Sequence, residues 1–196
     1  DAVPHFSGLD PEFTGHMATF DPGNRYAGLY VWGTTGFGYQ QQAITKRMAN
    51  APTDSWSMLL DPLVVAKFAD CGVSFLNDPN EVFAAAFRYL GLDINRQSLD
   101  DLKLAEAHLA KVRPSIRYFD NDRNISDLAN GDTCLAMSWN GNVSIAASQA
   151  QQAGKPGWFS WQALLSADDA TLAAPKRRLI IATPKLDFTA LQPGAA

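Results

Sequence analysis

In the middle of the chain, short apolar runs alternate with stretches of helical period. The apolar runs are Cys71–Leu76, Ser115–Phe119 and Asp132–Trp139, and polar turn residues bound each of them. Runs of this length are typical of buried strands. Helical patterns follow over 77–91, 98–111, 122–131 and 142–154. This strand–helix alternation predicts an α/β fold, with a parallel or mixed sheet and helices on its faces.

Capping residues mark the ends of the predicted helices. Asp78 suits an N-cap, Pro79 the first helical position and Gly91 the residue after the end. Ser98 is the predicted N-cap of the next helix, and Arg113-Pro114 stops it. The apolar residues of that helix are Leu99, Leu102, Leu104 and Leu109. Gly131 and Gly154 close the two later helices.

The flanking regions are less regular. A helix is expected to start near Asp10-Pro11, and 25–40 is predicted to be a strand that Gly33, Gly36 and Gly38 interrupt. A helix over Ser55–Phe68 restarts at Asp61-Pro62. Beyond Gly154 the alternation is lost, apart from one strand pattern at 179–183. We therefore predict a lobe over 1–154 and a divergent C-terminal tail over 155–196.

Composition narrows the class of protein. The 196 residues are 46% hydrophobic and 18% charged, which is enough for a packed core, and the net charge of −4 argues against a nucleic-acid binder. No apolar run approaches the ~20 residues that span a bilayer. Because the chain starts at Asp1 and lacks an apolar signal segment, we expect it to be a processed or trimmed product.

Trp139 stands where a predicted strand ends, in the stretch Cys134–Val143. Ligands bind at the carboxyl ends of strands in open α/β sheets, and an indole there can face a cation or stack on an apolar stem. The alternative is packing on the sheet edge, which the local pattern alone favours. Asn140 and Asn142 suit caps for the following helix.

Glu81 follows another predicted strand and allows two interpretations. With Asp78 it forms a capping-box-like pair in the first turn of a helix, and the pattern alone favours this role. The functional interpretation is a carboxylate at the same crevice as Trp139, where it would bind an ammonium group.

Motifs for catalysis, cofactors and metals are missing. The segment Gly33–Gly38 fits neither phosphate-loop pattern, no nucleophile elbow occurs, and the three histidines have no metal-ligand spacing. We therefore predict no enzymatic activity and no cofactor. Cys71 and Cys134 are either buried thiols or a disulfide formed in an oxidising compartment.

Four segments together resemble the bacterial periplasmic polyamine-binding proteins of ABC importers, with the putrescine-type members most similar. The segments are 30–40, 71–93, 113–132 and 134–143, and the resemblance runs from about Leu9 to Gly154. It implies one lobe, the second, of a two-lobed periplasmic-binding-protein fold of type II. It also implies a periplasmic location, putrescine or spermidine as ligand, and an inner-membrane ABC permease as partner.

The resemblance assigns roles to individual residues. Glu81 would pair with an amine, and Trp139 would pack on the methylene chain of the ligand. Asn142 stands where putrescine-type members carry an amine-binding aspartate, so one charged anchor is replaced by an amide. The matching cysteines of the family form a disulfide, which implies a Cys71–Cys134 bond.

The chain departs from the family by its length. Family members carry a first lobe with the opposite wall of the site, and the segment from Lys155 onward matches nothing in them. We therefore expect the chain alone to bind polyamines weakly or not at all, since an exposed ion pair contributes only ~0–1 kcal/mol. We also expect self-association, as a homodimer, through the strand at 26–39 or the tail. The alternative function is an interaction or regulatory module with a vestigial ligand site.

Overall fold

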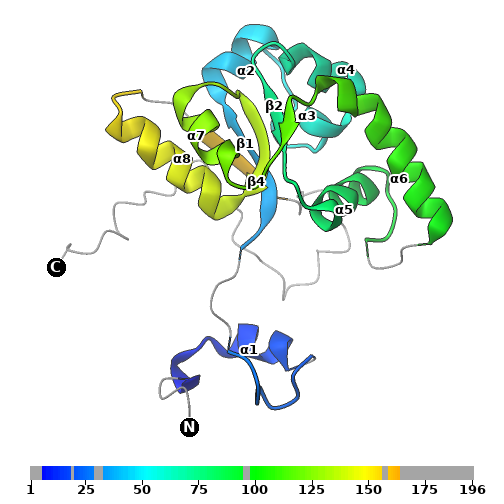
Figure 1. The fold of residues 1–196 in the computed structure, drawn as a ribbon, viewed down its shortest axis with the longest axis vertical. Coiled ribbons are helices and arrows are strands. Elements are labelled where there is room, and N and C mark those ends of the chain that lie inside the picture. The colour runs from blue at the N-terminus through cyan, green and yellow to red at the C-terminus, as the bar shows by residue number, and fades with distance from the viewer. Residues whose placement is uncertain (1–5, 19, 29–32, 95–97, 156–158, 164–196) are drawn as a thin grey trace. The chain divides into compact units, whose positions relative to one another are not determined.

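The computed structural model describes residues 6–18, 20–28, 33–94, 98–155 and 159–163. It divides into two units, Asp1–Gly33 and Thr34–Ala196 (Figure 1). The first unit contains the 3-10 helix η1, Phe6–Gly8, and helix α1, Pro11–Met17, which confirms the helix start predicted at Asp10-Pro11. Asp21 organises the turn beyond α1, because its Oδ2 accepts hydrogen bonds from the backbone N–H groups of Tyr26 and Ala27.

The second unit is built on a five-stranded mixed sheet with the order β3-β2-β4-β1-β5. The strands are β1 Thr35–Gln40, β2 Val73–Phe75, β3 Tyr118–Phe119, β4 Leu135–Trp139 and β5 Phe159–Ala163. Strand β2 runs parallel to β3 and β4, whereas β1 runs antiparallel to β4 and β5. The prediction of a mixed sheet is confirmed.

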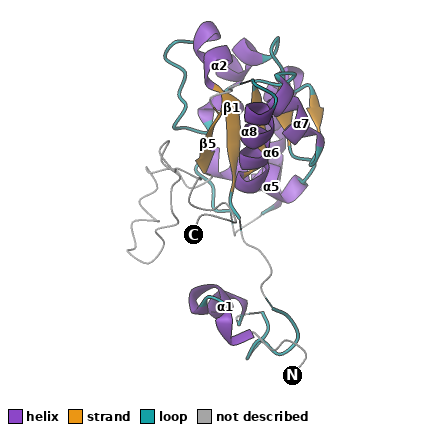
Figure 2. Cartoon of the chain, turned by 90° about the vertical axis from the view of Figure 1, so that its left-hand side faces the viewer, coloured by secondary structure: helices purple, strands orange, loops and turns teal. Residues whose placement is uncertain are grey.

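Helices cover both faces of this sheet (Figures 1 and 2). They are α2 Gln41–Arg47, α3 Ser57–Leu60, α4 Pro62–Val65, η2 Ala66–Phe68, α5 Pro79–Tyr89, α6 Leu99–Val112, η3 Arg113–Ser115, α7 Arg123–Asn130 and α8 Asn140–Gln152. The main apolar core lies between the sheet and helices α2 to α5, and a smaller core lies between the sheet and α7 and α8. The second unit is thus a helix–sheet–helix sandwich, which is the α/β architecture predicted.

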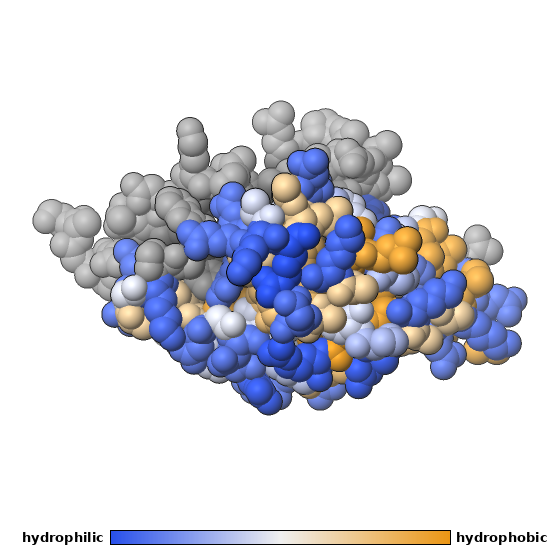
Figure 3. Space-filling view, turned by 90° about the horizontal axis from the view of Figure 1, so that it is seen from above, coloured by the Kyte–Doolittle hydropathy of each residue, from blue (hydrophilic) through white to orange (hydrophobic). Residues whose placement is uncertain are grey.

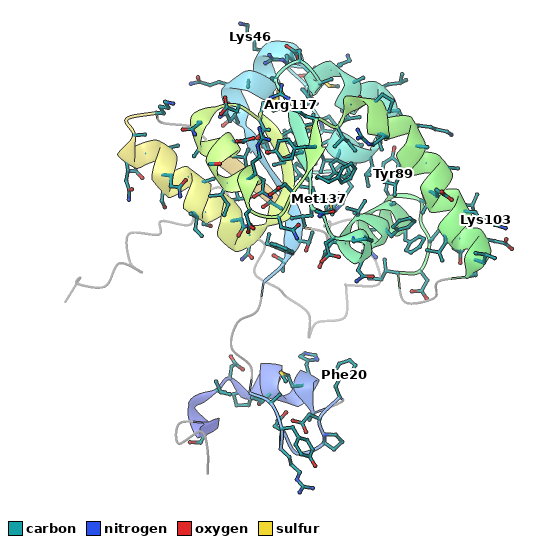
Figure 4. All side chains as sticks on the ribbon, in the orientation of Figure 1. Phe20, Lys46, Tyr89, Lys103, Arg117 and Met137 are labelled. Atoms are coloured by element: carbon teal, nitrogen blue, oxygen red, sulfur yellow. A yellow bond between two sulfur atoms is a disulfide. The ribbon has the colours of Figure 1, made fainter. Side chains whose placement is uncertain are left out.

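The two faces of the sheet carry side chains of different size. Phe37, Phe75 and Met137 point into the main core and are fully buried. In Figure 4, Met137 lies inside the unit, whereas Lys46 and Lys103 extend outward from α2 and α6. On the other face, a Cβ at Gly38 would lie 2.7 Å from a methyl group of Val143, so only glycine lets α8 pack this closely.

Most predicted helix ends are confirmed. The Asp61 carboxylate caps α4 by accepting from Leu63 N at 2.8 Å, and Asp78 caps α5 through Asn80 N at 3.0 Å. Ser98 and Asp101 form a complete capping box at the start of α6. The glycines predicted to close α5, α7 and α8 all have positive φ.

Other details differ from the sequence predictions. Of the strand predicted over 25–40, the structure shows Thr35–Gln40, in which Gly36 and Gly38 do not interrupt the strand. Residues 25–28 and 33–34 are not in a strand, and residues 29–32 lie outside the described residues. Helix α8 begins at Asn140, with Trp139 as its N-cap and no side-chain cap bond, so the prediction that Asn140 and Asn142 are caps is wrong. Their side chains bind neighbouring loops instead.

Helix α6 packs against α5, but only some of its predicted apolar leucines face the protein. Leu99 and Leu104 are 68% and 58% exposed, whereas Ala105 and Val112 are fully buried. The buried pair lies seven residues apart, about two helical turns, so it defines the face toward the protein. Seen from above, the surface is mostly polar, with apolar residues gathered toward one side (Figure 3).

The sheet continues beyond Gly154. Strand β5 pairs antiparallel with β1 along its whole length, from Gly36↔Ala163 to Gln40↔Phe159. Residues 164–196, with the strand predicted at 179–183, lie outside the described residues. The division into a lobe over 1–154 and a tail over 155–196 stays a prediction.

The pairing of β1 also bears on self-association. Strand β1 lies between β4 and β5, so the backbone of Thr35–Gln40 is hydrogen-bonded on both sides. This part of the 26–39 strand therefore offers no open edge to a second chain, contrary to our expectation. The described residues give no support to a homodimer, and the contact predicted through the tail falls largely on 164–196, outside the described part of the chain.

Candidate ligand-binding site

The carboxyl ends of the three parallel strands lie at one edge of the sheet. The segments at this edge are Leu76–Glu81, which enters the first turn of α5, Asp120–Asp122, which follows β3, and Trp139–Asn142, where β4 passes directly into α8. We call these three segments, referred to below as loops, the ligand edge. Because β1 is antiparallel, its first residue, Thr35, pairs with Trp139 at the same edge. Glu81, Trp139 and Asn142, far apart in the sequence, are thereby brought to one edge, as predicted.

Glu81 lies in the first turn of α5 and is partly buried. Its backbone N–H and that of Asn80 both donate to Asp78 Oδ1, at 3.4 and 3.0 Å. The Asp78 side chain therefore caps the helix. Within the described residues the Glu81 carboxylate has no hydrogen bond or ion pair, and the reciprocal half of a capping box is not formed. The carboxylate is available to an external cation.

Trp139 is the last residue of β4 and is partly buried. Its side chain is on the same face of the strand as Met137, and it packs against the rim of the main apolar core. The packing interpretation therefore holds for part of the indole. The remainder of the side chain is accessible to solvent.

Asn140 holds the segment that enters β1. Its Oδ1 accepts from Thr34 N at 3.2 Å, and its own N–H donates to Thr34 O at 3.1 Å. These two bonds join the start of α8 to the start of the antiparallel strand. The helix-cap interpretation missed this role.

Asn142, in the first turn of α8, is engaged by a different loop. Its Nδ2 donates to the carbonyl oxygen of Asn121 at 3.2 Å. The amide oxygen of Asn142 has no partner among the described residues, so it can still accept a hydrogen bond from a ligand.

Asn121 is a residue of this edge that the sequence analysis missed. Its Oδ1 accepts from Asn77 N at 2.9 Å, while its carbonyl oxygen binds Asn142. A signal was present in the sequence, since Asn77, Asn121 and Asn140 each stand one or two residues after a predicted strand. Asparagine at strand ends commonly binds nearby backbone groups.

The aspartates of the ligand edge have structural roles. Asp120 Oδ1 accepts from Asp122 N at 2.9 Å and Arg123 N at 2.8 Å, and these backbone bonds, with that to Arg123 first, lower the pKa of the Asp120 carboxyl. Asp78 is likewise occupied as a cap. Glu81 is therefore the partly buried carboxylate left without a described partner.

Helix α7 is fixed behind this edge by a polar cluster. Tyr118 OH donates to Asp127 Oδ2 at 2.8 Å, and Arg123 Nε donates to the same oxygen at 3.0 Å. Burial, followed by the bond to Asp127, raises the pKa of Tyr118 to about 12. The phenol therefore stays protonated as a hydrogen-bond donor at physiological pH. The cluster anchors α7 and offers no general base to the edge.

The opposite end of the sheet carries the disulfide. Cys71 and Cys134 are bonded, with their Cα atoms 5.5 Å apart, and the bond joins the segments that lead into β2 and β4. The implied Cys71–Cys134 bond is confirmed. Within the described residues, no helix is long and apolar enough to cross a membrane, and no group of three or more potential metal-ligating residues occurs.

Comparison with known proteins identifies relatives by sequence. No family model matches the chain. The putrescine-binding periplasmic protein PotF of Escherichia coli is 44% identical over 153 residues, which are 77% of this chain and 41% of that protein. A putrescine/agmatine-binding protein of Pseudomonas aeruginosa is 40% identical over 155 residues, 79% of this chain and 42% of that protein. The chain thus spans about two-fifths of the length of these relatives.

Solved structures share the fold. The spermidine/putrescine substrate-binding protein PotD of Streptococcus pneumoniae superposes with a TM-score of 0.62 at 19% identity, over 82% of this chain and 44% of its own. The TpPotD lipoprotein of Treponema pallidum gives a TM-score of 0.61 at 20% identity, over 81% and 46%. The chain therefore has the fold of one lobe of a type II periplasmic binding protein, and it is homologous over about three-quarters of its length to part of the bacterial polyamine-binding periplasmic proteins.

Proposed function

We propose that this chain binds polyamines, putrescine or spermidine, at the ligand edge, as part of the substrate-binding component of an ABC importer. The observation that carries the proposal is the Glu81 carboxylate, partly buried and without a described partner, at the same edge as the partly exposed indole of Trp139. The loops bearing the two residues follow neighbouring parallel strands, β2 and β4. The names of the sequence relatives support the same ligand class.

The chemistry of this edge suits an aliphatic amine. An ammonium group donates charge-assisted hydrogen bonds to the Glu81 carboxylate. The methylene chain covers the exposed part of the Trp139 ring, and an adjacent ammonium gains a cation–π contact there. The Asn142 amide oxygen accepts a hydrogen bond from the second amine of the ligand or from a water molecule bound to that amine. Since Asn142 brings no charge, Glu81 is the principal anionic anchor.

The wider role that we propose follows from the similarity to the named periplasmic binding proteins. The protein would act in the periplasm, bind its ligand without transforming it, and deliver it to an inner-membrane permease. A disulfide is compatible with that oxidising compartment. The alternative, an interaction module with a vestigial site, is not favoured, because the named relatives are ligand-binding proteins.

The affinity of this chain alone is expected to be low. The ligand edge is a single wall, and an ion pair that water still reaches contributes only ~0–1 kcal/mol. A closed site would exclude water and strengthen each electrostatic contact. We therefore expect saturable binding in about the millimolar range.

The experiment is an NMR titration of the full chain with putrescine and with spermidine at low salt, using the Trp139 indole and Asn142 side-chain resonances as reporters. Glu81→Gln should weaken putrescine binding about three- to tenfold, because it removes the anionic partner and keeps the shape. Glu106→Gln, on the exposed surface of α6, is the matched control and should leave the binding curve unchanged.

Butane-1,4-diol, which has the length of putrescine without its charges, should not bind. Equal losses in the Glu81 and Glu106 variants would show nonspecific attraction to an acidic protein and refute the proposed site. Absence of any saturable shift with either amine would refute binding by this chain.

A further inference from the structure

We infer that Asn121 is a positioning residue that sets the spacing between the Glu81 loop and the Trp139–Asn142 loop. The inference deepens the proposed function and rests on it for its ligand class. Its evidence is separate, because it comes from the hydrogen bonds within the ligand edge and needs no ligand to be observed.

Asn121 contacts both ligand-bearing loops at once. Its side-chain oxygen accepts from Asn77 N at 2.9 Å, just before the cap of α5, and its carbonyl oxygen accepts from Asn142 Nδ2 at 3.2 Å. Strand β3 lies at the sheet border next to β2, and β4 lies on the far side of β2. The loop after β3 therefore reaches across the end of β2 to bind the start of α8.

The loop that carries Asn121 is itself held on both sides. Asp120 N donates to Phe75 O at 3.0 Å, which fastens the loop to β2. The Asp120 carboxylate accepts from Asp122 N and Arg123 N, which fastens the loop to the start of α7. Because these bonds hold the residues on both sides of Asn121, the position of Asn121 is fixed. Asn121 can therefore fix the positions of the two loops that it binds.

The consequence concerns ligand length. Glu81 stands four residues after Asn77, on the helix whose start Asn121 holds, and the bond to Asn142 Nδ2 orients the amide so that its oxygen remains free. A diamine that reaches from Glu81 to Asn142 must match the separation of these two groups. Asn121 thus acts on selectivity among diamines of different length, without contacting the ligand.

A purely structural role makes a different prediction. If Asn121 only stabilised its loop, its loss would lower the stability of the protein and weaken all diamines by the same factor. The ratio of affinities for two diamines separates the alternatives, because it cancels any uniform loss of folded protein.

The test compares three variants of the full chain. Asn121→Ala removes the acceptor for Asn77 N and keeps the backbone carbonyl that binds Asn142. Asn121→Asp keeps the acceptor. Asn130→Ala, at the exposed C-terminal end of helix α7, which follows the Asn121 loop, is the matched control. Dissociation constants for 1,3-diaminopropane, putrescine and cadaverine are measured by NMR titration.

Asn121→Ala should weaken the preferred diamine about three- to tenfold, the effect of one lost hydrogen bond, and bring the three affinities within about twofold of one another. Asn121→Asp should restore the wild-type order of affinities, although its charge strengthens all three. Asn130→Ala should change nothing. An unchanged affinity ratio in Asn121→Ala, or an Asp variant that behaves like the Ala variant, would overturn the inference.

A ligand-free measurement keeps the test separate from the proposed function. In Asn121→Ala, the Asn77 amide should exchange with solvent about tenfold faster, and the Asn142 side-chain NH2 and Trp139 indole resonances should shift, because the two loops lose their common support. Unmoved Asn142 and Trp139 resonances would refute the positioning role even if the wild-type chain bound no amine. Failure of amine binding with these shifts present would refute only the proposed function.

Discussion

The two ends of the sheet differ in how their polar side chains are hydrogen-bonded. At the disulfide end, two arginines are bound within the protein: Arg47 pairs with the Asp70 carboxylate through two bonds of 2.8 and 2.7 Å, and Arg117 donates to the backbone oxygens of Asp132 and Asp70. At the ligand edge, asparagines bind the loops to one another, and the Glu81 carboxylate has no described partner. One end stabilises the lobe, and the other keeps polar groups available on a fixed frame.

This difference is what the proposed function requires. A carboxylate paired within the protein cannot bind an external ammonium without first breaking its bond. Neutral amides can join loops without neutralising nearby carboxylates, because they offer both donors and acceptors. At the ligand edge, amides join the loops to one another, while the Asp78 and Asp120 carboxylates bind backbone N–H groups of their own loops. Changes at the disulfide end should alter stability, whereas changes to Glu81 or to the amides of the ligand edge should mainly alter binding.

The largest effect is expected from loss of the disulfide. Cys71 and Cys134 close a loop with a sequence separation of 63, and replacing both by alanine should lower the free energy of unfolding by about 2–4 kcal/mol. Urea denaturation of the wild type and the variant measures this difference in the free energy of unfolding. The amide resonances of the ligand edge should keep their positions in the folded variant. Unchanged stability, or widespread shifts at the ligand edge, would contradict the division between the two ends.

Alanine substitutions of two glycines, one at each end of the sheet, should have smaller and more local effects on stability. Gly72, at the disulfide end, has φ +94°, and a Cβ there would lie 2.7 Å from Arg117 and from the Asp132 carbonyl. Gly72→Ala should destabilise the protein by about 1–3 kcal/mol, because it forces both strain and a clash.

Gly141, at the ligand edge, lies in α8, and a Cβ there would have no neighbour within 4 Å. Gly141→Ala should therefore be neutral or stabilise the protein by up to about 0.5–1 kcal/mol, because alanine favours the helix. Thermal unfolding of the two variants compares them directly. Equal destabilisation of both would show that the ligand edge is packed as tightly as the disulfide end.

The smallest effect is expected from pH. The bonds from Arg47 lower the pKa of Asp70, and backbone bonds lower the pKa of Asp120. Since the folded pKa of each lies below its unfolded value of about 3.9, each contributes stability above that pH and loses it as pH falls through the folded pKa. Urea unfolding at pH values from about 6 down to about 2 should show this decline.

Asp70→Asn and Asp120→Asn should each flatten part of the curve, and Glu106→Gln, on the exposed surface of α6, serves as the control. A decline of the same size in the double variant as in the wild type would show that other carboxylates cause it. Because the Asp70 side chain is exposed to solvent, added salt should reduce the part that Asp70 contributes.

The helix ends and the strand–helix alternation could be predicted because they depend on neighbours in the sequence. Asp61, Asp78 and Ser98 cap helices whose first residues lie immediately after them. The position of Glu81 and Trp139 at one edge followed from the same alternation, since parallel strands place their following loops together. The ligand roles proposed for them came from the resemblance, because a local pattern cannot separate a packed indole from one that faces a ligand.

Interactions between sequence neighbours therefore determined the set of elements, their caps and the edge to which the site residues belong. Tertiary structure alone decided how β1 enters the sheet, that β5 extends it beyond Gly154, and which atoms of the ligand edge remain free. The deciding hydrogen bonds join residues 21, 44 and 106 positions apart, from Asn142 to Asn121, Asn77 to Asn121, and Thr34 to Asn140. Such pairs are chosen by strand order and packing, and no local propensity encodes them.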